Sequence, residues 1–322
     1  MNDRRVLIVS TIADVATDDV IRRLAARGAA YARINTEDYP FSRTLSFVVG
    51  QSAPSGWLDI DGEAIPLPTS VWYRRMRTPA KPEAMDSGVY EFCLHESRAT
   101  LLGSILGLTT RWMSHPAAIW SSEFKPFQLS LAAKIGLTIP PTIITNDPNA
   151  IKKAFDRFGA MIVKPVRRGH ITHAGCSSAI FTSQVLREHL DEIESARYSP
   201  AIYQALIPKR YDIRVTIVGH RVFAAAIDSR SDPAAAIDWR LTHNPALPHH
   251  STHLPEQLLD QLRRLMEVLG LTFGAIDLVQ NTDGKFVFLE VNPNGQWLWL
   301  DRTLDMGISE AVAEWLAEDK LT

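Results

Sequence analysis

Two apolar segments near the C-terminal end of the chain carry three side chains whose oxygens suit a hard metal ion. Asp277 lies in residues 274–280, and Glu290 and Asn292 lie in residues 285–292. Mg²⁺ in proteins takes oxygen ligands, commonly one or two carboxylates together with substrate phosphates. This set therefore predicts a magnesium site, provided that folding brings the three side chains together.

The turn between the two segments predicts that it does. Asp283 and Gly284 form a strong hairpin signal. Counting outward from a turn centred on them places Asp277 opposite Glu290, with Asn292 on the same face. The alternative is that Asp277 lies at a solvated edge and Glu290 pairs with a Lys or Arg. We favour a metal because the strands are otherwise apolar, and burial makes an uncompensated carboxylate pair expensive.

Other charged residues stand on segments that are also expected to be ordered. Lys164 lies inside a short apolar strand, where an unpaired ammonium would be costly. Asp212 and Arg214 are two positions apart on another strand, so they share a face and Asp212 can orient the guanidinium. Lys125 opens a helix. Taken alone, each Lys is more often a solvated charge, and the Asp–Arg pair can be purely structural.

Composition indicates an ordinary globular protein. The 322 residues are 46% hydrophobic and 22% charged, and the length suggests two or three domains. The 34 Lys and Arg residues nearly balance 36 Asp and Glu, so we expect no nucleic-acid or membrane partner. Cys93 and Cys176 fit neither a disulfide framework nor a thiolate zinc site. No signal peptide or membrane span is evident, and we expect a cytoplasmic protein.

The order of predicted elements indicates an α/β fold. Residues 6–34 read as a strand, a helix and a second strand. Short helices and strands follow a boundary near residue 115, and strands dominate from residue 201. We expect an N-terminal α/β domain at residues 1–115, a central lobe at 116–200, and a C-terminal lobe with the metal hairpin at 201–322.

Taken together in chain order, these residues resemble the motifs of an ATP-grasp ligase. The closest pattern is that of the ribosomal-peptide ligases that make microviridin-type (graspetide) lactone and lactam cross-links. Ribosomal-protein glutamate ligases are the nearest broader relatives. The short motifs at residues 72–75 and 238–240 favour the peptide-cross-linking group. The residues that carry the resemblance are Lys125, Lys164, the segment 204–207, Asp212, Arg214, Asp277, Glu290 and Asn292.

The resemblance implies an ATP-grasp fold of α+β type, in which a pre-ATP-grasp domain precedes two lobes that sandwich ATP. It implies that Lys125 and Lys164 contact the ATP phosphates beneath a covering turn at residues 167–178. The metal set would hold two Mg²⁺ ions.

The resemblance also assigns roles to the remaining motif residues. Asp212 belongs with the nucleotide-binding residues, Arg214 suits the γ-phosphate and an acyl phosphate, and Arg240 takes a second phosphate or substrate role. One segment would bind adenine through its backbone, although it also reads as a plain core strand. Its residues are Gln204, Ala205, Leu206 and Ile207.

The implied activity is ATP-dependent activation of Asp or Glu side chains in a ribosomal precursor peptide. Attack by a hydroxyl or amine of the same peptide would close an ester or amide ring and release ADP and phosphate. Two alternatives stay open: addition of a free amino acid to a peptide or protein, and a regulatory protein that binds Mg·ATP without turnover. The partner would be the leader and core of the precursor, and the resemblance leaves a homodimer open.

Four other features suggest chemistry less strongly. His243, His249, His250 and His253 would suit zinc, but a mobile loop at residues 231–255 is favoured because no helical spacing orders them. Cys176 lacks the surroundings of a nucleophile. Trp297 and Trp299 alternate along an extended segment, for which packing is favoured over an acceptor-site wall. The charges at residues 72–77 would suit acidic leader segments, unless they belong to a solubilising edge strand.

Overall fold

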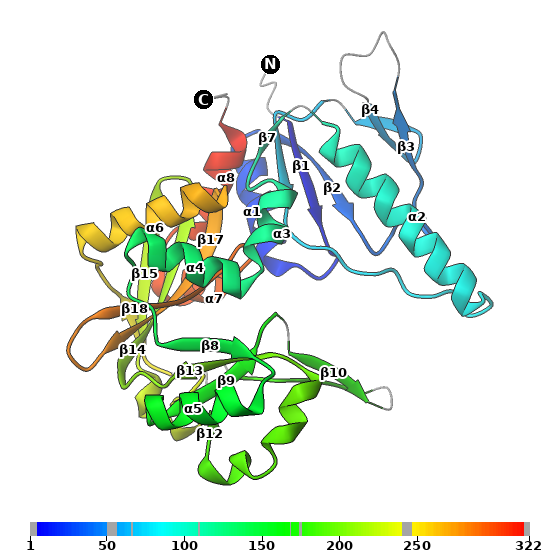
Figure 1. Cartoon of the computed structure of the whole chain (residues 1–322). Helices are drawn as coiled ribbons and strands as arrows, with labels where there is room; N and C mark the ends of the chain where they lie inside the picture. The colour runs from blue at the N-terminus through cyan, green and yellow to red at the C-terminus, as the bar shows by residue number, and fades with distance from the viewer. Residues whose placement is uncertain are drawn as a thin grey trace. The chain divides into compact units, whose positions relative to one another are not determined.

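The computed structural model describes residues 5–49, 57–65, 67–108, 110–167, 169–173, 176–239 and 247–318. The chain forms two compact units (Figure 1). Unit 1 comprises Met1–Ala118, Gly270–Phe273 and Gln296–Thr322, and unit 2 comprises Ile119–Leu269 and Gly274–Gly295. The three-part division drawn from the sequence stays a proposal.

Unit 1 is built on a parallel sheet with strand order β2-β1-β6-β7. A separate antiparallel sheet has the order β3-β4-β5. The apolar residues Val6 to Val9 of strand β1 are all buried, as expected where helices cover a parallel sheet. The strands are β1 (Arg5–Ser10), β2 (Ala30–Asn35), β3 (Leu45–Val48), β4 (Trp57–Ile60), β5 (Glu63–Ile65), β6 (Ser70–Tyr73) and β7 (Arg111–Trp112). The helices are α1 (Val15–Ala26), α2 (Ser87–Leu106), α7 (Leu298–Leu304) and α8 (Ile308–Ala317), and α3 (Pro116–Ser122) leads into unit 2.

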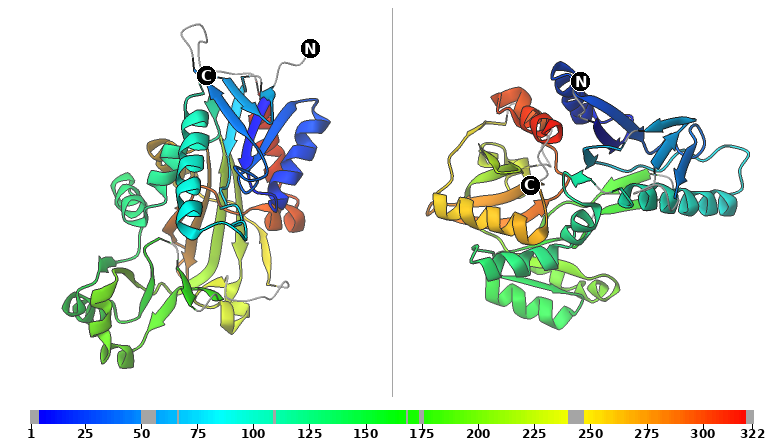
Figure 2. Two further views of the ribbon diagram at one scale, coloured as in Figure 1. Left: turned by 90° about the vertical axis from the view of Figure 1, so that its right-hand side faces the viewer. Right: turned by 90° about the horizontal axis from the view of Figure 1, so that it is seen from above.

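The two ends of the chain meet inside unit 1. Helix α8 packs on α1, and Arg23 of α1 forms an ion pair of 2.7 Å with Glu310 of α8. Figure 2 shows the red C-terminal helix beside the blue N-terminal elements. The C-terminal segment therefore completes the core that the N-terminal βαβ unit begins.

The tryptophans near the C-terminal end lie at the start of a helix rather than on the extended segment expected from the sequence. Trp297 precedes α7 as its N-cap residue, and Trp299 is inside the helix. Trp297 is fully buried against Trp72 and Phe273, at ring-centroid distances of 6.0 and 5.0 Å. Trp297 therefore has the packing role that was expected for it.

A buried ion pair at the end of β6 corrects the docking surface suggested at residues 72–77. Trp72 and Arg74 are buried, and β6 is an inner strand, so neither residue lies on a solvated edge. Arg74 Nε lies 3.6 Å from Asp14 Oδ2, and its guanidinium stacks over Trp297. Arg77 remains exposed. The sequence could not reveal this burial, because arginines on short strands usually face solvent.

The described part of unit 2 contains a four-stranded sheet, a larger five-stranded sheet and a two-stranded hairpin, and the four-stranded sheet has the order β12-β9-β13-β8. Helix α5 packs on it, with Ile151 and Met161 fully buried in the shared core. A separate hairpin of β10 and β11 follows β9. The elements are β8 (Thr142–Thr145), α5 (Pro148–Phe158), β9 (Met161–Pro165), β10 (His170–His173), β11 (Cys176–Ala179), β12 (Ser183–Val185), the 3-10 helices η1 (Arg187–Leu190) and η2 (Ile193–Tyr198), and β13 (Ala201–Ala205).

The larger sheet has the order β16-β15-β14-β17-β18. Helix α4 packs on β18 and on α6, and Figure 1 shows α4 and α6 on the same side of the sheet. The elements are α4 (Lys125–Ile135), β14 (Lys209–Val218), β15 (Arg221–Ile227), the 3-10 helices η3 (Ser229–Ser231) and η4 (Pro233–Ala235), β16 (His249–Ser251), α6 (Glu256–Leu269), β17 (Phe273–Asn281) and β18 (Phe286–Asn292).

The segment expected as a loop at residues 231–255 contains regular structure. Its described parts include η4 and the strand β16, which pairs with β15. Strand β16 reads His-His-Ser and carries no apolar alternation, so the sequence pattern did not predict it.

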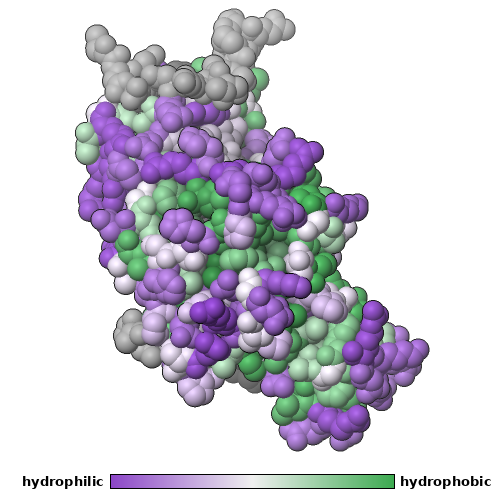
Figure 3. Space-filling model, turned by 90° about the vertical axis from the view of Figure 1, so that its left-hand side faces the viewer, coloured by the Kyte–Doolittle hydropathy of each residue, from purple (hydrophilic) through white to green (hydrophobic). Residues whose placement is uncertain are grey.

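On the face drawn in Figure 3, hydrophilic residues are widespread and hydrophobic residues are exposed between them. No helix in the described part of the chain is long and apolar enough to cross a membrane.

Candidate active site

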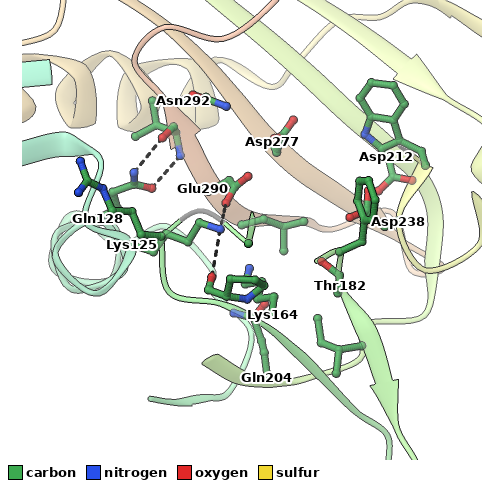
Figure 4. Close-up of a pocket in the computed structure, with 18 of the residues that line it drawn as sticks. Lys125, Gln128, Lys164, Thr182, Gln204, Asp212, Asp238, Asp277, Glu290 and Asn292 are labelled. Carbon is green, nitrogen blue, oxygen red and sulfur yellow. Dashed lines mark hydrogen bonds and ion pairs between the residues drawn. The ribbon is translucent and has the colours of Figure 1, made fainter. Parts of the chain in front are cut away.

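The hairpin of β17 and β18 brings two carboxylates opposite each other. Asp277 is the cross-strand partner of Glu290, as predicted, and Asn292 pairs with Ala275 two positions along the same face. The side chains of Asp277 and Glu290 are 18% and 12% exposed. Figure 4 shows both carboxylates and Asn292 among the residues that line one cavity.

The predicted pairing is reached by a different route from the one counted in the sequence. The Asn281 N–H donates to the Lys285 carbonyl, so the loop between them holds three residues instead of two. Gly284 takes the positive φ of 83° that such a loop requires. A register shift beside Asp277 then moves the pairing by one residue and restores the opposition to Glu290. The turn was predicted wrongly and the pair correctly.

Both carboxylates also accept from cations. Lys125 Nζ lies 3.0 Å from Glu290 Oε2, and Arg214 Nη1 donates to Asp277 Oδ1 at 2.7 Å. The Lys125–Glu290 pair matches one part of the alternative weighed against a metal site, whereas Asp277 is largely buried and does not lie at a solvated edge. The two ion pairs do not compete with a metal in principle, because an ionised carboxylate offers about four lone-pair positions and can accept from a cation while ligating a metal. Two carboxylates and an amide oxygen remain a donor set that fits Mg²⁺.

Two lysines from different elements line the same cavity. Lys164 lies on β9 and is only 8% exposed, and Lys125 is the first residue of α4. Lys125 also donates to the Pro165 carbonyl at 3.4 Å, which ties it to the end of the strand that carries Lys164. The structure thus places two ammonium groups around the space that the carboxylates face, as a metal-bound polyphosphate requires.

Of the four residues expected to bind adenine, Gln204 lines the cavity. Its side chain is buried and donates to the Thr142 hydroxyl at 2.8 Å. The N–H groups of Ala205 and Leu206 donate to the carbonyls of Pro141 and Ala160, so both already have protein acceptors. Ile207 follows on the same segment but does not line the cavity in the described residues. Adenine binding by this segment stays a proposal.

Asp212 and Arg214 follow each other along β14 but have different partners. Arg214 contacts Asp277, whereas Asp212 accepts from Lys209 Nζ at 2.7 Å. Burial raises the pKa of Asp212, and the charge and hydrogen bond of Lys209 offset part of that effect. Lys209 is a partner that the sequence analysis did not single out. Asp212 lines the cavity beside its ion pair with Lys209.

Several cavity residues escaped the sequence analysis. Gln128 is buried beside Val291, and its amide bonds both peptide groups of that residue. Glu123 accepts from Arg167 Nη2 at 2.8 Å, which links the segment before α4 to the one after β9. A glutamine or a surface ion pair leaves no distinctive pattern in a single sequence. Asp238 and Trp239 also line the cavity, and they appeared in the sequence analysis only as part of a family motif.

Some predicted residues fall outside what the structure describes. Arg240 and His243 lie outside the described residues, and for Cys176 only the backbone is described. The phosphate-covering turn expected at residues 167–178 contains the β10–β11 hairpin. Among described residues, no three His, Cys, Asp or Glu side chains gather where they could hold a metal ion. The Asp277–Glu290–Asn292 set, with two acids and an amide, is a different kind of site.

The cavity has a volume of about 330 Å³, within the range of small-molecule and cofactor sites. Its wall joins charged groups to apolar side chains that can flank a planar base, and every described residue that lines it belongs to unit 2. The apolar residues include Ile162, Ile180, Phe181, Ile213, Leu278 and Leu289.

Comparisons with known proteins show which proteins the chain resembles in sequence and fold. The family model for the MvdD pre-ATP-grasp domain matches residues 5–119. A RiPP-associated ATP-grasp ligase from Chryseobacterium gregarium, solved with ADP and a leader and core peptide, superposes with a TM-score of 0.92 at 28% identity, covering 98% of this chain and 97% of that one. The macrocyclase MdnC from Microcystis aeruginosa MRC, solved with precursor peptide MdnA, superposes with a TM-score of 0.86 at 32% identity. That match covers 97% of this chain and 99% of the macrocyclase chain.

The fold and the cavity define an ATP-grasp ligase, with a pre-ATP-grasp domain ahead of the nucleotide-binding part. Within that class, the chain belongs to the ATP-grasp ligases that modify ribosomally synthesised peptides (RiPPs). A more distant curated relative is the β-citrylglutamate synthase B of Danio rerio, at 24% identity over 229 residues. The match covers 69% of this chain. It spans about half of the relative's length, 54%.

Proposed function

We propose that this ligase phosphorylates Asp or Glu side chains of a ribosomal precursor peptide and closes intramolecular ester or amide cross-links, releasing ADP and phosphate. One observation carries the proposal. The cavity gathers two lysines and an Asp–Glu–Asn set in a chain that is 32% identical to a macrocyclase over nearly its whole length. The expected substrates are therefore ATP and the core of a precursor peptide.

In this proposal Asp277, Glu290 and Asn292 hold magnesium, and Lys125 and Lys164 hold the ATP phosphates. We propose two Mg²⁺ ions, since a polyphosphate facing two carboxylates needs that much added positive charge. Bound magnesium would neutralise charge on the phosphate oxygens and favour departure of ADP. The apolar wall near Gln204 is the part of the cavity suited to adenine.

The first step transfers a phosphoryl group to the peptide. A carboxylate oxygen of the peptide forms a bond to the γ-phosphorus, the bond from that phosphorus to the ADP oxygen breaks, and an acyl phosphate results. Arg214 lies next to Asp277 at 2.7 Å and is only 8% exposed, so its charge acts with little screening. We propose that Arg214 stabilises the negative charge that develops on the transferred phosphoryl group.

The second step closes the ring. A hydroxyl or amine of the same peptide attacks the acyl carbon, its proton is released, and phosphate leaves with the electron pair of the broken bond. The peptide loses one water for each ring. We propose a supporting phosphate or substrate role for Arg240, which follows the cavity residues Asp238 and Trp239 in the chain.

The mass of the peptide tests the proposal. The full chain is incubated with ATP, Mg²⁺ and a precursor peptide encoded beside its gene. We expect a mass lower by one water per ring, with one ADP released for each. An unchanged peptide without release of ADP would contradict the proposal, and omission of ATP provides the control.

A second candidate function is the addition of a free amino acid to an acceptor. The distant similarity to β-citrylglutamate synthase B supports this alternative. The activated carboxylate would be the same, but the attacking amine would come from a separate molecule. The peptide mass would then rise, and only when an amino acid is supplied, so the same spectra separate the two functions.

A further inference from the structure

Gln128 makes an unusual set of contacts with the strand that carries the proposed metal ligands. It lies on α4 and is 2% exposed. Its Nε2 donates to the Val291 carbonyl at 2.8 Å, and its Oε1 accepts from the Val291 N–H at 2.9 Å. The same Nε2 also donates to the Ser122 carbonyl. One buried amide therefore satisfies both peptide groups of a single strand residue, as a neighbouring strand would.

The position of Val291 makes this contact important. Strand β18 is the last strand in its sheet, so its outer edge needs partners other than a strand. The Phe288 N–H on this strand donates to the Thr138 carbonyl at 2.8 Å, and Gln128 serves Val291 three residues later. An uninterrupted strand turns alternate residues to the same edge, so a spacing of three marks the irregularity beside Asp277 and Glu290.

Val291 stands between the two proposed ligands on β18. Val291 is buried, and Glu290 and Asn292 on either side of it line the cavity, to which Val291 itself also contributes. Because side chains alternate along a strand, fixing the peptide groups of Val291 fixes the directions of both neighbours. The same helix also supplies Lys125, one turn earlier, which contacts Glu290 at 3.0 Å.

We propose that Gln128 is a positioning residue for the divalent-cation site. Its amide holds β18 in the shifted register and thereby sets Glu290 opposite Asp277, with Asn292 beside them. This inference rests on the proposed metal site. It does not assign Gln128 any contact with the metal, ATP or the peptide.

The test uses the full chain with Gln128→Met, which removes both amide groups at similar size. Gln128→Asn shortens the side chain by one methylene, so that the amide is retained but moves away from β18. It serves as the milder variant if Gln128→Met does not fold. Gln261→Met is the control, because Gln261 also donates to a backbone carbonyl, that of Gly136 at 2.8 Å, which lies at the C-terminal end of α4 and not on β18.

Two measurements are made on each variant. Binding of Mn²⁺ in the presence of ADP is followed by electron paramagnetic resonance, and amide hydrogen exchange of residues 286–292 is followed by mass spectrometry without metal. We expect Gln128→Met to weaken Mn²⁺ binding about 10-fold or more, as loss of an outer support does, and to speed exchange across β18. Gln128→Asn should change both in the same direction, and Gln261→Met should change neither.

Three other results would overturn the positioning role of Gln128, and each can be told from the others. Folded Gln128 variants that bind Mn²⁺ as tightly as the wild type would overturn the positioning role while leaving the proposed metal site intact. Equal weakening by Gln261→Met would reduce Gln128 to general support of the fold. Failure of the wild-type chain to bind Mn²⁺ would overturn the metal site and the positioning role together.

Discussion

Lys164 is the basic residue whose sequence context and structure agree best. It interrupts an apolar strand, and the structure buries it in the wall of the cavity. Because a buried ammonium needs anionic partners, its position suits the phosphates of ATP. A lysine of the same chain that lies on an exposed helix face, such as Lys152 of α5, has no comparable surroundings.

We therefore predict that Lys164→Met lowers ATP-dependent turnover roughly 10²- to 10³-fold, the range seen when one preorganised donor is lost. Lys152→Met should leave turnover unchanged. Release of ADP in the presence of peptide is the measurement. Equal turnover of Lys164→Met and the wild-type chain would exclude a phosphate contact by Lys164.

The opposed carboxylates give a second prediction for single residues. We expect Asp277→Asn and Glu290→Gln each to raise the Mg²⁺ concentration needed for half-maximal turnover about 10-fold or more, since each removes one anionic ligand. Asp283→Asn, at the exposed turn of the same hairpin, is the control and should not change it. If the two site variants respond to Mg²⁺ as Asp283→Asn does, the carboxylates hold no metal.

At the level of single residues, the sequence predicts what depends on local periodicity. Alternation along two strands and a turn signal predicted that Asp277 and Glu290 lie opposite each other, although the structure reaches this pairing through a longer loop and a register shift. Gln128 could not be found in this way, because its role depends on α4 lying against β18, far away in the chain. Arg74 escaped for the same reason, since its burial depends on Trp297 and Asp14.

The β17–β18 hairpin shows what sequence can and cannot determine for an element. Both strands were expected close to their observed bounds, because apolar alternation and a glycine-containing turn are strong signals. The extra loop residue and the compensating register shift were not expected. Bulges depend on what lies along the strand edge, and a single sequence carries little record of that.

Gly295, just after β18, gives a prediction at this level. A Cβ at this position would overlap with Ala275 Cβ and lie 3.0 Å from Arg214 Nη2. We predict that Gly295→Ala destabilises the fold by about 1–3 kcal/mol through overpacking, and lowers turnover by displacing Arg214. Urea unfolding and ADP release measure the two effects.

Gly103→Ala is the matched control for this variant. Gly103 lies within α2, and a Cβ there would meet nothing within 4 Å. The replacement should stabilise the chain by about 0.5–1 kcal/mol, because alanine loses less backbone entropy in a helix. A Gly295→Ala variant as stable and active as Gly103→Ala would show that the close approach at Gly295 is unimportant.

For the molecule as a whole, we expect a buried ion pair in unit 1 to make stability depend on pH. Burial of Asp14 alone would raise the pKa of its carboxyl, but Arg74, the Ser10 hydroxyl and Arg75 together hold that pKa below its ordinary value of 3.8. Burial lowers the pKa of the Arg74 guanidinium to about 9, and Asp14 offsets part of this effect. Ionisation of Asp14 is therefore favoured more in the folded chain than in the unfolded one.

We predict that Asp14→Asn destabilises unit 1 by about 3 kcal/mol or more at neutral pH, because it leaves Arg74 buried beside an uncharged partner. The contribution of Asp14 is fully present above its ordinary pKa and is lost as the pH falls through the lower, folded-state pKa. The stability difference from wild type should thus shrink in acid. Asp18→Asn removes an ion pair with Arg33, and the Asp18 side chain is 50% exposed. This replacement should lower the free energy of unfolding by about 1 kcal/mol or less.

Unfolding in urea at several pH values checks this prediction. A constant difference between Asp14→Asn and the wild type from neutral to acid pH would contradict the assignment. Equal effects of Asp14→Asn and Asp18→Asn at neutral pH would also contradict it, since the buried pair would then contribute no more than the exposed one.

Transfer of oxygen from the peptide to phosphate would show that this ligase activates a peptide carboxylate as an acyl phosphate. The most direct measurement uses a precursor peptide whose Asp and Glu carboxylates carry heavy oxygen, incubated with the full chain, ATP and Mg²⁺. We predict one heavy oxygen in the inorganic phosphate for each ring closed, because the attacking carboxylate oxygen leaves with the phosphoryl group. Rings that form without heavy oxygen in the phosphate, or with it in AMP, would contradict the mechanism.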